Sequence, residues 1–358
     1  MSGPFGSSQW MYSSAAPGWL GGRGVFMGGY ISDSAPQYTN QIDYITIAST
    51  GNSQDFGDIA STGAAMAGCS NGTRAVSAGG YVGGATVDVM EYITIANTGN
   101  TSDFGDLSVA RRNFGTASDG SRGIWAGGNG NDVIDYVTID TTGDATDFGN
   151  LLANWDDAGN NGIGNATRGV FGGGASSGRS DVIQYITIAS TGNALDFGNL
   201  LSVALGVTAC SDATRGVWGG GSPSGGGTRQ NVIQYITVAT TGNSLDFGDL
   251  SSERVHGGSL ADESRGIWAG GITTGGSGTN DVIEYITIQS TGNVTDFGDL
   301  AEDKFAPSGS CDGIRGVFST GQSNTTNQIH YITMQSPGNS TDFGDLTGGR
   351  QCGAVAGN

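Results

Sequence analysis

The chain is organised around a stretch that occurs seven times, and its sixth copy reads Tyr285-Ile286-Thr287-Ile288-Gln289-Ser290-Thr291-Gly292-Asn293-Val294-Thr295-Asp296-Phe297-Gly298-Asp299-Leu300. The tyrosines that open the copies follow one another at intervals of 44 to 50 residues. In every copy the aspartate of Asp-Phe-Gly lies eleven residues after the tyrosine. A period of this length indicates an array of like structural units.

Each unit contains the pattern of several short strands. A run such as Arg215-Gly216-Val217-Trp218 ends in a glycine pair and predicts one strand. The alternating Ile-x-Tyr-Ile-Thr-Ile predicts a second, and Thr-Gly-Asn predicts a turn. We expect Asp-Phe-Gly-Asp-Leu to form a short outer strand. A small-residue stretch, 203–210 in one unit, is expected to form the innermost strand, where space is limited.

This order of signals resembles the kelch repeat: a strand ending in Gly-Gly, a variable loop, a strand with tyrosine, and an aromatic residue about a dozen positions later. Phenylalanine replaces the usual tryptophan of the outer strand, as in Phe197 and Phe247. The resemblance covers about residues 23–358. It implies an all-β fold, a seven-bladed β-propeller with four-stranded, kelch-like blades.

The two ends of the chain predict how such a ring closes. Residues 353–358 align with the innermost-strand segment 115–120, and the first unit lacks an innermost strand of its own. We therefore expect the C-terminal strand to join the first blade, which removes two exposed strand edges.

Composition excludes several classes of partner. The chain is acidic, with 14 Lys+Arg against 33 Asp+Glu and a net charge of −19, which argues against binding to nucleic acid or to an anionic membrane surface. No apolar run approaches the ~20 residues that span a bilayer, so no membrane insertion is expected. The N-terminus lacks the pattern of a secretory signal. The four cysteines form no CxxC pair, and we expect free buried thiols.

Residues 1–22 precede the first unit and do not match it. This arm is rich in large apolar side chains, namely Phe5, Trp10, Met11, Tyr12 and Trp19. Such a cluster either forms a contact surface that anchors the protein to a partner or covers the flank of the propeller.

Two sets of polar residues recur in all seven units and are expected to be structural. The arginines that open the units (Arg23, Arg74, Arg122, Arg168, Arg215, Arg265 and Arg315) are predicted to pair with carboxylates or carbonyls between strands. The aspartates of Asp-Phe-Gly are predicted to cap turns through backbone N–H groups.

The sequence gives little support for an enzyme. Only His256 and His330 are present, at non-equivalent positions, so neither a copper site of histidine and tyrosine ligands nor a histidine-based triad can be assembled. Asp156 and Asp157 are adjacent carboxylates outside the repeat pattern. Residues 127–134 match a calcium-binding nonapeptide, but in a single copy, which favours a glycine-rich loop. We expect no enzyme activity, no cofactor and no metal.

Variation in length is concentrated in two kinds of loop. The distance from the opening arginine to the tyrosine varies between 14 and 21 residues, and one connection between units, near Trp155, is two residues longer than the others. In a four-stranded antiparallel blade both kinds of loop emerge on the same face, which we call the loop face. Such a surface on a rigid scaffold predicts recognition, with neutral drift of the loops as the alternative. The candidate ligand-binding residues are Tyr30, Tyr38, Tyr81, Asn129, Asp132, Trp155, Asp156, Arg179 and Arg229, with Trp155 as an exposed platform suited to sugars.

The sequence of the repeats is similar to that of the divergent kelch-like repeats in virion proteins of tailed phages, particularly aquatic phages. The resemblance implies a non-enzymatic structural or adhesion protein of the virion, assembled in the host cytoplasm. It would be displayed on a tail, fibre or capsid, contact host surface polysaccharide or another virion protein, and be tethered by the N-terminal arm. A cellular scaffold propeller for protein–protein interaction and a glycan hydrolase are the alternatives.

Overall fold

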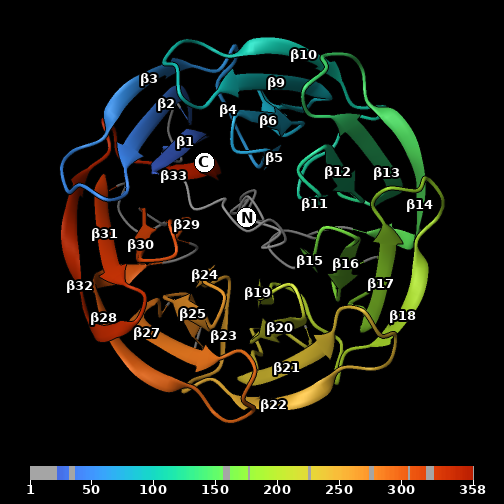
Figure 1. The fold of residues 1–358 in the computed structure, drawn as a ribbon, viewed down its shortest axis with the longest axis vertical. Helices are drawn as coiled ribbons and strands as arrows, with labels where there is room; N and C mark the ends of the chain where they lie inside the picture. Colours follow the sequence, from blue (N-terminus) through green and yellow to red (C-terminus); the bar gives the residue numbers. More distant parts are fainter. Residues whose placement is uncertain are drawn as a thin grey trace.

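A computed structural model describes residues 22–31, 37–155, 162–175, 178–224, 227–273, 278–304, 307–319 and 326–357, with the backbone alone for Lys304 and 351–357. Within these residues the fold is all-β. It contains seven four-stranded antiparallel sheets, one three-stranded sheet and one two-stranded sheet. Figure 1 shows the four-stranded sheets arranged around a central axis.

The four-stranded sheets are numbered in chain order, and their strands are given from the innermost outward. Sheet one contains β33 (Gln351–Gly357), β1 (Arg23–Tyr30), β2 (Tyr38–Thr46) and β3 (Gln54–Asp58). Sheet two contains β5 (Ala67–Ser70), β6 (Arg74–Ala78), β9 (Val89–Thr94) and β10 (Ser102–Asp106). Sheet three contains β11 (Gly115–Ser118), β12 (Arg122–Ala126), β13 (Asn131–Thr138) and β14 (Thr146–Trp155). Sheet four contains β15 (Gly162–Gly164), β16 (Arg168–Gly172), β17 (Val182–Thr187) and β18 (Leu195–Asn199).

Sheet five contains β19 (Thr208–Ser211), β20 (Arg215–Gly219), β21 (Val232–Thr237) and β22 (Leu245–Asp249). Sheet six contains β24 (Gly258–Ala261), β25 (Arg265–Ala269), β27 (Asn280–Thr287) and β28 (Thr295–Lys304). Sheet seven contains β29 (Gly309–Cys311), β30 (Arg315–Phe318), β31 (Gln328–Thr333) and β32 (Ser336–Asp345). The small sheets are formed by β4 (Gly63–Ala64), β7 (Tyr81–Val82) and β8 (Ala85–Thr86), and by β23 (Arg254–Val255) and β26 (Ile272–Thr273).

Six of the described four-stranded sheets are each built from one continuous stretch of the chain, whereas sheet one draws on both ends. Strand β33 pairs antiparallel with β1, in a register that runs from Gly24 opposite Gly357 to Tyr30 opposite Gln351. Segments more than 300 residues apart in sequence are therefore hydrogen-bonded neighbours.

The innermost strand of sheet five is shorter than the sequence predicts. Strand β19 covers only Thr208–Ser211, so the earlier part of the segment 203–210 belongs to the connection between sheets. Gly206 has a φ of +68°, which turns the chain before the strand begins.

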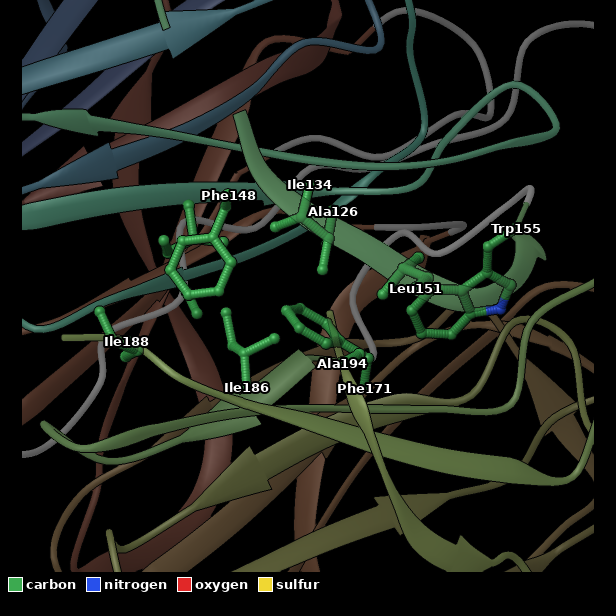
Figure 2. Close-up of a cluster of buried hydrophobic side chains, with 11 residues drawn as sticks. Ala126, Ile134, Phe148, Leu151, Trp155, Phe171, Ile186, Ile188 and Ala194 are labelled. Carbon is green, nitrogen blue, oxygen red and sulfur yellow. The ribbon is translucent and has the colours of Figure 1, made fainter. Parts of the chain in front are cut away.

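The hydrophobic core of the described residues consists of seven clusters, and each lies between two neighbouring sheets. Figure 2 shows the cluster between sheets three and four, in which Phe148 and Leu151 of β14 face Phe171 and Ile186 of the next sheet. Another cluster joins Val317 of sheet seven to Phe26 of sheet one. Because each sheet buries both faces against its neighbours, the alternating side chains of strands such as β21 are buried on either side.

The seven opening arginines connect neighbouring sheets. The guanidinium of Arg215 lies 4.2 Å from the ring centroid of Tyr235 in its own sheet, and its Nη1 donates a hydrogen bond of 2.9 Å to the carbonyl oxygen of Ile288 in sheet six. The same contacts recur around the molecule, and Arg315 of sheet seven donates to the carbonyl oxygen of Ile47 beside sheet one. The predicted pairing with carbonyls is confirmed.

The Thr-Gly-Asn turns also connect neighbouring sheets, a role that the sequence did not reveal. The Oδ1 atom of Asn243 accepts a hydrogen bond from the backbone N–H of Asn199 in the preceding sheet, and Asn52 accepts one from Asp345. Three Asp-Phe-Gly aspartates accept a backbone N–H as predicted, although within the outer strand and not at a turn: Asp147 Oδ1 accepts the N–H of Gly149 at 3.0 Å, and Asp55 and Asp342 make the same bond.

Three buried ion pairs lie where the connection between sheets meets the next tyrosine-bearing strand. Arg111 pairs with Asp135 at 2.6 Å and Arg350 pairs with Asp43 at 2.8 Å, and Arg254 pairs with Glu284. All six side chains are at most 3% exposed. Burial lowers the pKa of Arg111 and of Arg254, and the carboxylate partner of each opposes that shift.

Three described cysteines are free thiols, as expected. Cys69 and Cys210 are buried and Cys311 is partly buried. Burial raises the pKa of Cys69 to about 12 and that of Cys311 to about 11, so both are protonated and unreactive at neutral pH. In the part of the chain that the structure describes, no helix is long and apolar enough to traverse a membrane.

Candidate functional site

The variable loops and the connections between sheets emerge together, as the loop-face prediction requires. In the connection that follows sheet one, strand β4 pairs with β7, which lies in the variable loop of sheet two. In the connection before sheet six, strand β23 pairs with β26, which lies in the variable loop of that sheet. Each small sheet therefore ties a variable loop to a connection, so that these parts of the loop face have regular hydrogen-bonded structure.

Three of the predicted residues form one cluster, which we call the tyrosine cluster: Tyr30, Tyr38 and Tyr81. Tyr30 and Tyr38 lie opposite each other at the end of the β1–β2 pair, with ring centroids 5.9 Å apart. Tyr81 of β7 packs edge-to-face against Tyr38 at 6.0 Å. All three side chains are partly exposed. The cluster thus spans sheets one and two and presents aromatic surface to solvent.

Arg112 completes the cluster and is not among the residues predicted from the sequence. Its guanidinium lies 4.6 Å from the ring centroid of Tyr81. Burial raises the pKa of Tyr38, and Tyr81 adds to this shift while Arg112 opposes it. At neutral pH the Tyr38 phenol is therefore protonated and can both donate and accept a hydrogen bond. The pair Arg111-Arg112, where other units have no second arginine, was the available signal in the sequence.

Trp155 is buried, so the expectation of an exposed platform was wrong. Its side chain is 2% exposed and packs against Phe171 with ring centroids 5.9 Å apart (Figure 2). Its Nε1 donates to the carbonyl oxygen of Gly173 at 2.5 Å. The indole fills space left by Gly174, where an added Cβ would lie 1.4 Å from Nε1. Strand β14 continues past Leu151 and carries Trp155 into the core between two sheets.

The remaining candidates do not all join the cluster. Asn129 is exposed in a tight turn with φ of +52°, and the preceding Gly128 packs against the carbonyl oxygen of Arg112. Asn129 therefore follows a residue that lies against the backbone of Arg112. Asp132 lies at the start of β13 and accepts a hydrogen bond of 3.3 Å from Asn150 Nδ2, within sheet three.

Other predicted residues lie outside the described part of the chain. These are Asp156, and Phe5, Trp10, Met11, Tyr12 and Trp19 of the N-terminal arm. The segment 127–134 is a turn followed by β13, and the described residues contain no group of three or more His, Cys, Asp or Glu that could hold a metal ion.

Arg179 and Arg229 meet at a second place on the loop face. Both line a pocket between the variable loops of sheets four, five and six, with Ser222 and His256. Arg179 Nη2 donates a hydrogen bond of 3.1 Å to Ser222 Oγ, and Arg229 donates to the carbonyl oxygen of Thr273. The loop face thus has an aromatic site over sheets one and two and a cationic site over sheets four to six.

No protein-family model and no curated protein sequence matches the chain. Among solved structures, the chain is similar to one described as "Structure of YjhT", with a TM-score of 0.61 and 10% sequence identity. The match covers 78% of this chain and 97% of that one. At this identity the likeness concerns the fold alone. Together with antiparallel four-stranded sheets around one axis, it assigns the chain to the β-propeller fold.

Proposed function

We propose that the chain is a seven-bladed, kelch-like propeller whose ring is closed by β33 beside β1. Three contacts between the ends of the chain support this architecture. They are the β33–β1 ladder, the hydrogen bond from Arg315 to Ile47, and the hydrogen bond from the Asp345 N–H to Asn52. The ladder completes sheet one with a strand from the other end of the chain, and the two hydrogen bonds repeat contacts that link the other neighbouring sheets, as a closed ring requires.

We further propose that this propeller is a non-enzymatic structural and adhesion protein of a tailed-phage virion, assembled in the host cytoplasm. Its partner on the loop face would be a host surface glycan. The tyrosine cluster is the observation that carries this proposal. Three partly exposed aromatic rings from two sheets, bordered by an arginine, form a non-repeated surface on an otherwise repeated scaffold.

The chemistry of the cluster suits a sugar. A tyrosine ring offers an apolar face for the C–H side of a pyranose and a hydroxyl for its polar edge. Arg112 adds donors on a planar group that can stack or hydrogen-bond. The neighbouring strands β4, β7 and β8 hold Tyr81 in a small hydrogen-bonded sheet, which limits the conformational entropy lost on binding.

Binding of the purified protein to an array of bacterial surface polysaccharides tests the glycan role. Tyr38→Ala and Tyr81→Ala each remove one ring from the cluster, and we expect at least about a tenfold loss of binding, as for a well-buried aromatic contact. Tyr38→Phe and Tyr81→Phe are matched controls that keep the rings and should retain most binding. Unchanged binding by both alanine variants would refute a glycan site at this cluster.

The N-terminal arm is proposed as the tether to other virion proteins. Deletion of residues 1–22 should leave the melting temperature of the propeller nearly unchanged and abolish incorporation into particles. A deletion variant that is incorporated normally would contradict the tether, and a large loss of stability would indicate that the arm covers the propeller instead.

A further inference from the structure

The arginines of this acidic chain divide into two groups by their partners. Of thirteen arginines, seven form the contacts between sheets and three form the buried ion pairs. The other three are Arg112, Arg179 and Arg229, and all of them lie on the loop face. Two of these three line the same pocket.

The pocket has a volume of about 220 Å³ and is open to solvent. Arg179 comes from the variable loop of sheet four, Ser222 and Arg229 come from that of sheet five, and His256 comes from the connection before sheet six. Leu205, Val255 and Ile272 supply apolar walls. This volume is below the roughly 300–1,000 Å³ of pockets for drug-sized ligands, so it suits one sugar ring or a group of similar size.

The two arginines in this pocket make their described hydrogen bonds to neutral groups. None of the described residues that line it carries a carboxylate. The hydrogen bonds of Arg179 and Arg229 go to a hydroxyl and a backbone carbonyl, which are neutral. Nε of Arg179 is buried and has no hydrogen-bond partner among the described residues. Burial also lowers the pKa of Arg229, and no carboxylate opposes that shift.

An unmatched pair of guanidinium groups in a concave site is the arrangement that recognises a planar or tetrahedral oxyanion. The rest of the protein carries a large negative charge, so general electrostatics repels anions and only a specific site would hold one. We infer that this pocket binds the carboxylate or sulfate group of an acidic sugar, with Arg179 and Arg229 as the groups that contact the oxyanion. That the ligand is a saccharide rests on the proposed function, whereas the oxyanion site rests on the pocket alone.

Calorimetric titration of the full chain tests the inference with three small probes: sodium glucuronate, N-acetylglucosamine 6-sulfate and glucose. We expect one of the two acidic sugars to bind with one-to-one stoichiometry and glucose to give no measurable binding. The sugar that binds more tightly identifies the oxyanion as a carboxylate or a sulfate. Equal binding of glucose, or no binding of either acidic sugar, would overturn the inference.

Charge-matched variants locate the site. Arg179→Gln and Arg229→Gln should each lower the affinity for the acidic sugar at least about tenfold, as expected for the loss of a charge-assisted hydrogen bond. Thr291→Asp, at an exposed turn that does not line the pocket, makes the same change of net charge and should alter the affinity less than about twofold. An equal loss in all three variants would show a diffuse charge effect and refute the pocket. Arg229→Lys keeps the charge but not the planar guanidinium, and should lower the affinity less than Arg229→Gln does.

The two sites can fail independently. Tyr38→Ala should leave the acidic-sugar titration unchanged, because Tyr38 does not line the pocket. A protein that binds the array through the tyrosine cluster but ignores both acidic sugars would retain the proposed function and lose this inference.

Discussion

Sheets five and six solve the same packing problem with different residues. In sheet five the side-chain oxygen of Gln234 accepts the backbone N–H of Leu201 at 2.7 Å. In sheet six the equivalent residue is Glu284, which accepts the N–H of Ser251 at 3.1 Å. Glu284 also pairs with Arg254, whereas the residue that matches Arg254 in sheet five is Ala204.

The comparison shows which features are shared by the residues at the position of Gln234 and Glu284, and which features vary. In most sheets a side-chain oxygen accepts the N–H that follows the repeat leucine or isoleucine, and the same bond is made by Asp135, Gln184 and Glu91, whereas sheet seven has His330 at this position. A buried charge is optional, but where a fully buried carboxylate is present an arginine accompanies it. An uncharged acceptor such as Gln234 beside Ala204 can therefore take the place of the ion pair. Where the pair is present, each charge is needed to compensate the other.

The loop face follows a different rule. Arg179 and Arg229 are partly buried cations whose described contacts include no carboxylate. On the scaffold, a buried carboxylate without its arginine would be unstable. On the loop face, we infer that an acidic ligand from outside the chain supplies the negative charge.

The largest effect is expected from breaking the ion pair of sheet six. Arg254→Ala leaves Glu284 buried and uncompensated, so the free energy of unfolding should fall by about 3–5 kcal/mol. Urea denaturation followed by tryptophan fluorescence measures this change. A loss below about 1 kcal/mol would show that the buried carboxylate is not costly.

The double variant Arg254→Ala/Glu284→Gln converts sheet six to the residues of sheet five. Because it restores a neutral acceptor beside alanine, as in Ala204 and Gln234, it should recover most of the loss and lie within about 1.5 kcal/mol of the wild type. If the double variant is as unstable as the single one, the comparison between the two sheets fails.

Removing a repeated arginine should cost less. Arg215→Ala deletes the contact with the Tyr235 ring and the hydrogen bond to Ile288, so we expect a loss of about 1–3 kcal/mol in the free energy of unfolding. Arg215→Lys keeps the charge but not the planar guanidinium. Its free energy of unfolding should therefore lie between those of the wild type and Arg215→Ala. An unchanged melting temperature for Arg215→Ala would rule the pairing out.

The smallest effect concerns Glu91 of sheet two, where the residue matching Arg254 is Gly63. Burial raises the pKa of Glu91, so the folded protein holds this proton more tightly than the unfolded chain does. Its contribution to stability is greatest at acid pH and is lost as the pH rises through the raised folded value. Glu91→Gln keeps an oxygen for the N–H of Ala60 and should therefore stabilise the protein slightly at pH 7.

That advantage should disappear below about pH 4, where the wild-type carboxyl is protonated in both states. Melting temperatures of the two proteins at pH 3.5 and pH 7 provide the comparison. A variant less stable than the wild type at pH 7 would contradict the role assigned to burial.

Much of the scaffold could be predicted because its residues recur in seven sequence repeats. Repetition separated the structural Arg215 and Asp147 from the variable loops, and alternation located strands such as β21. The role of Asn243 in joining two sheets was missed, because a turn signal predicts local geometry and says nothing about which neighbour the turn meets.

The candidate site was predicted less well, because it depends on where loops return in space. The tyrosine cluster joins Tyr38 and Tyr81, which no sequence pattern connects. The prediction of an exposed Trp155 was wrong because β14 extends to this residue, where the longer connection indicates a loop. Trp155 stands four residues after Leu151, as Arg111 stands four after Leu107, and this spacing marks a buried position.

Amide hydrogen exchange of the C-terminal strand tests the closed ring most directly. Peptides covering residues 351–357 should exchange as slowly as those covering β5, the equivalent strand of sheet two, because their ladder with β1 is hydrogen-bonded from Gly24 to Tyr30. Exchange of these amides at the rate of an unstructured chain, with β5 protected, would contradict the ring.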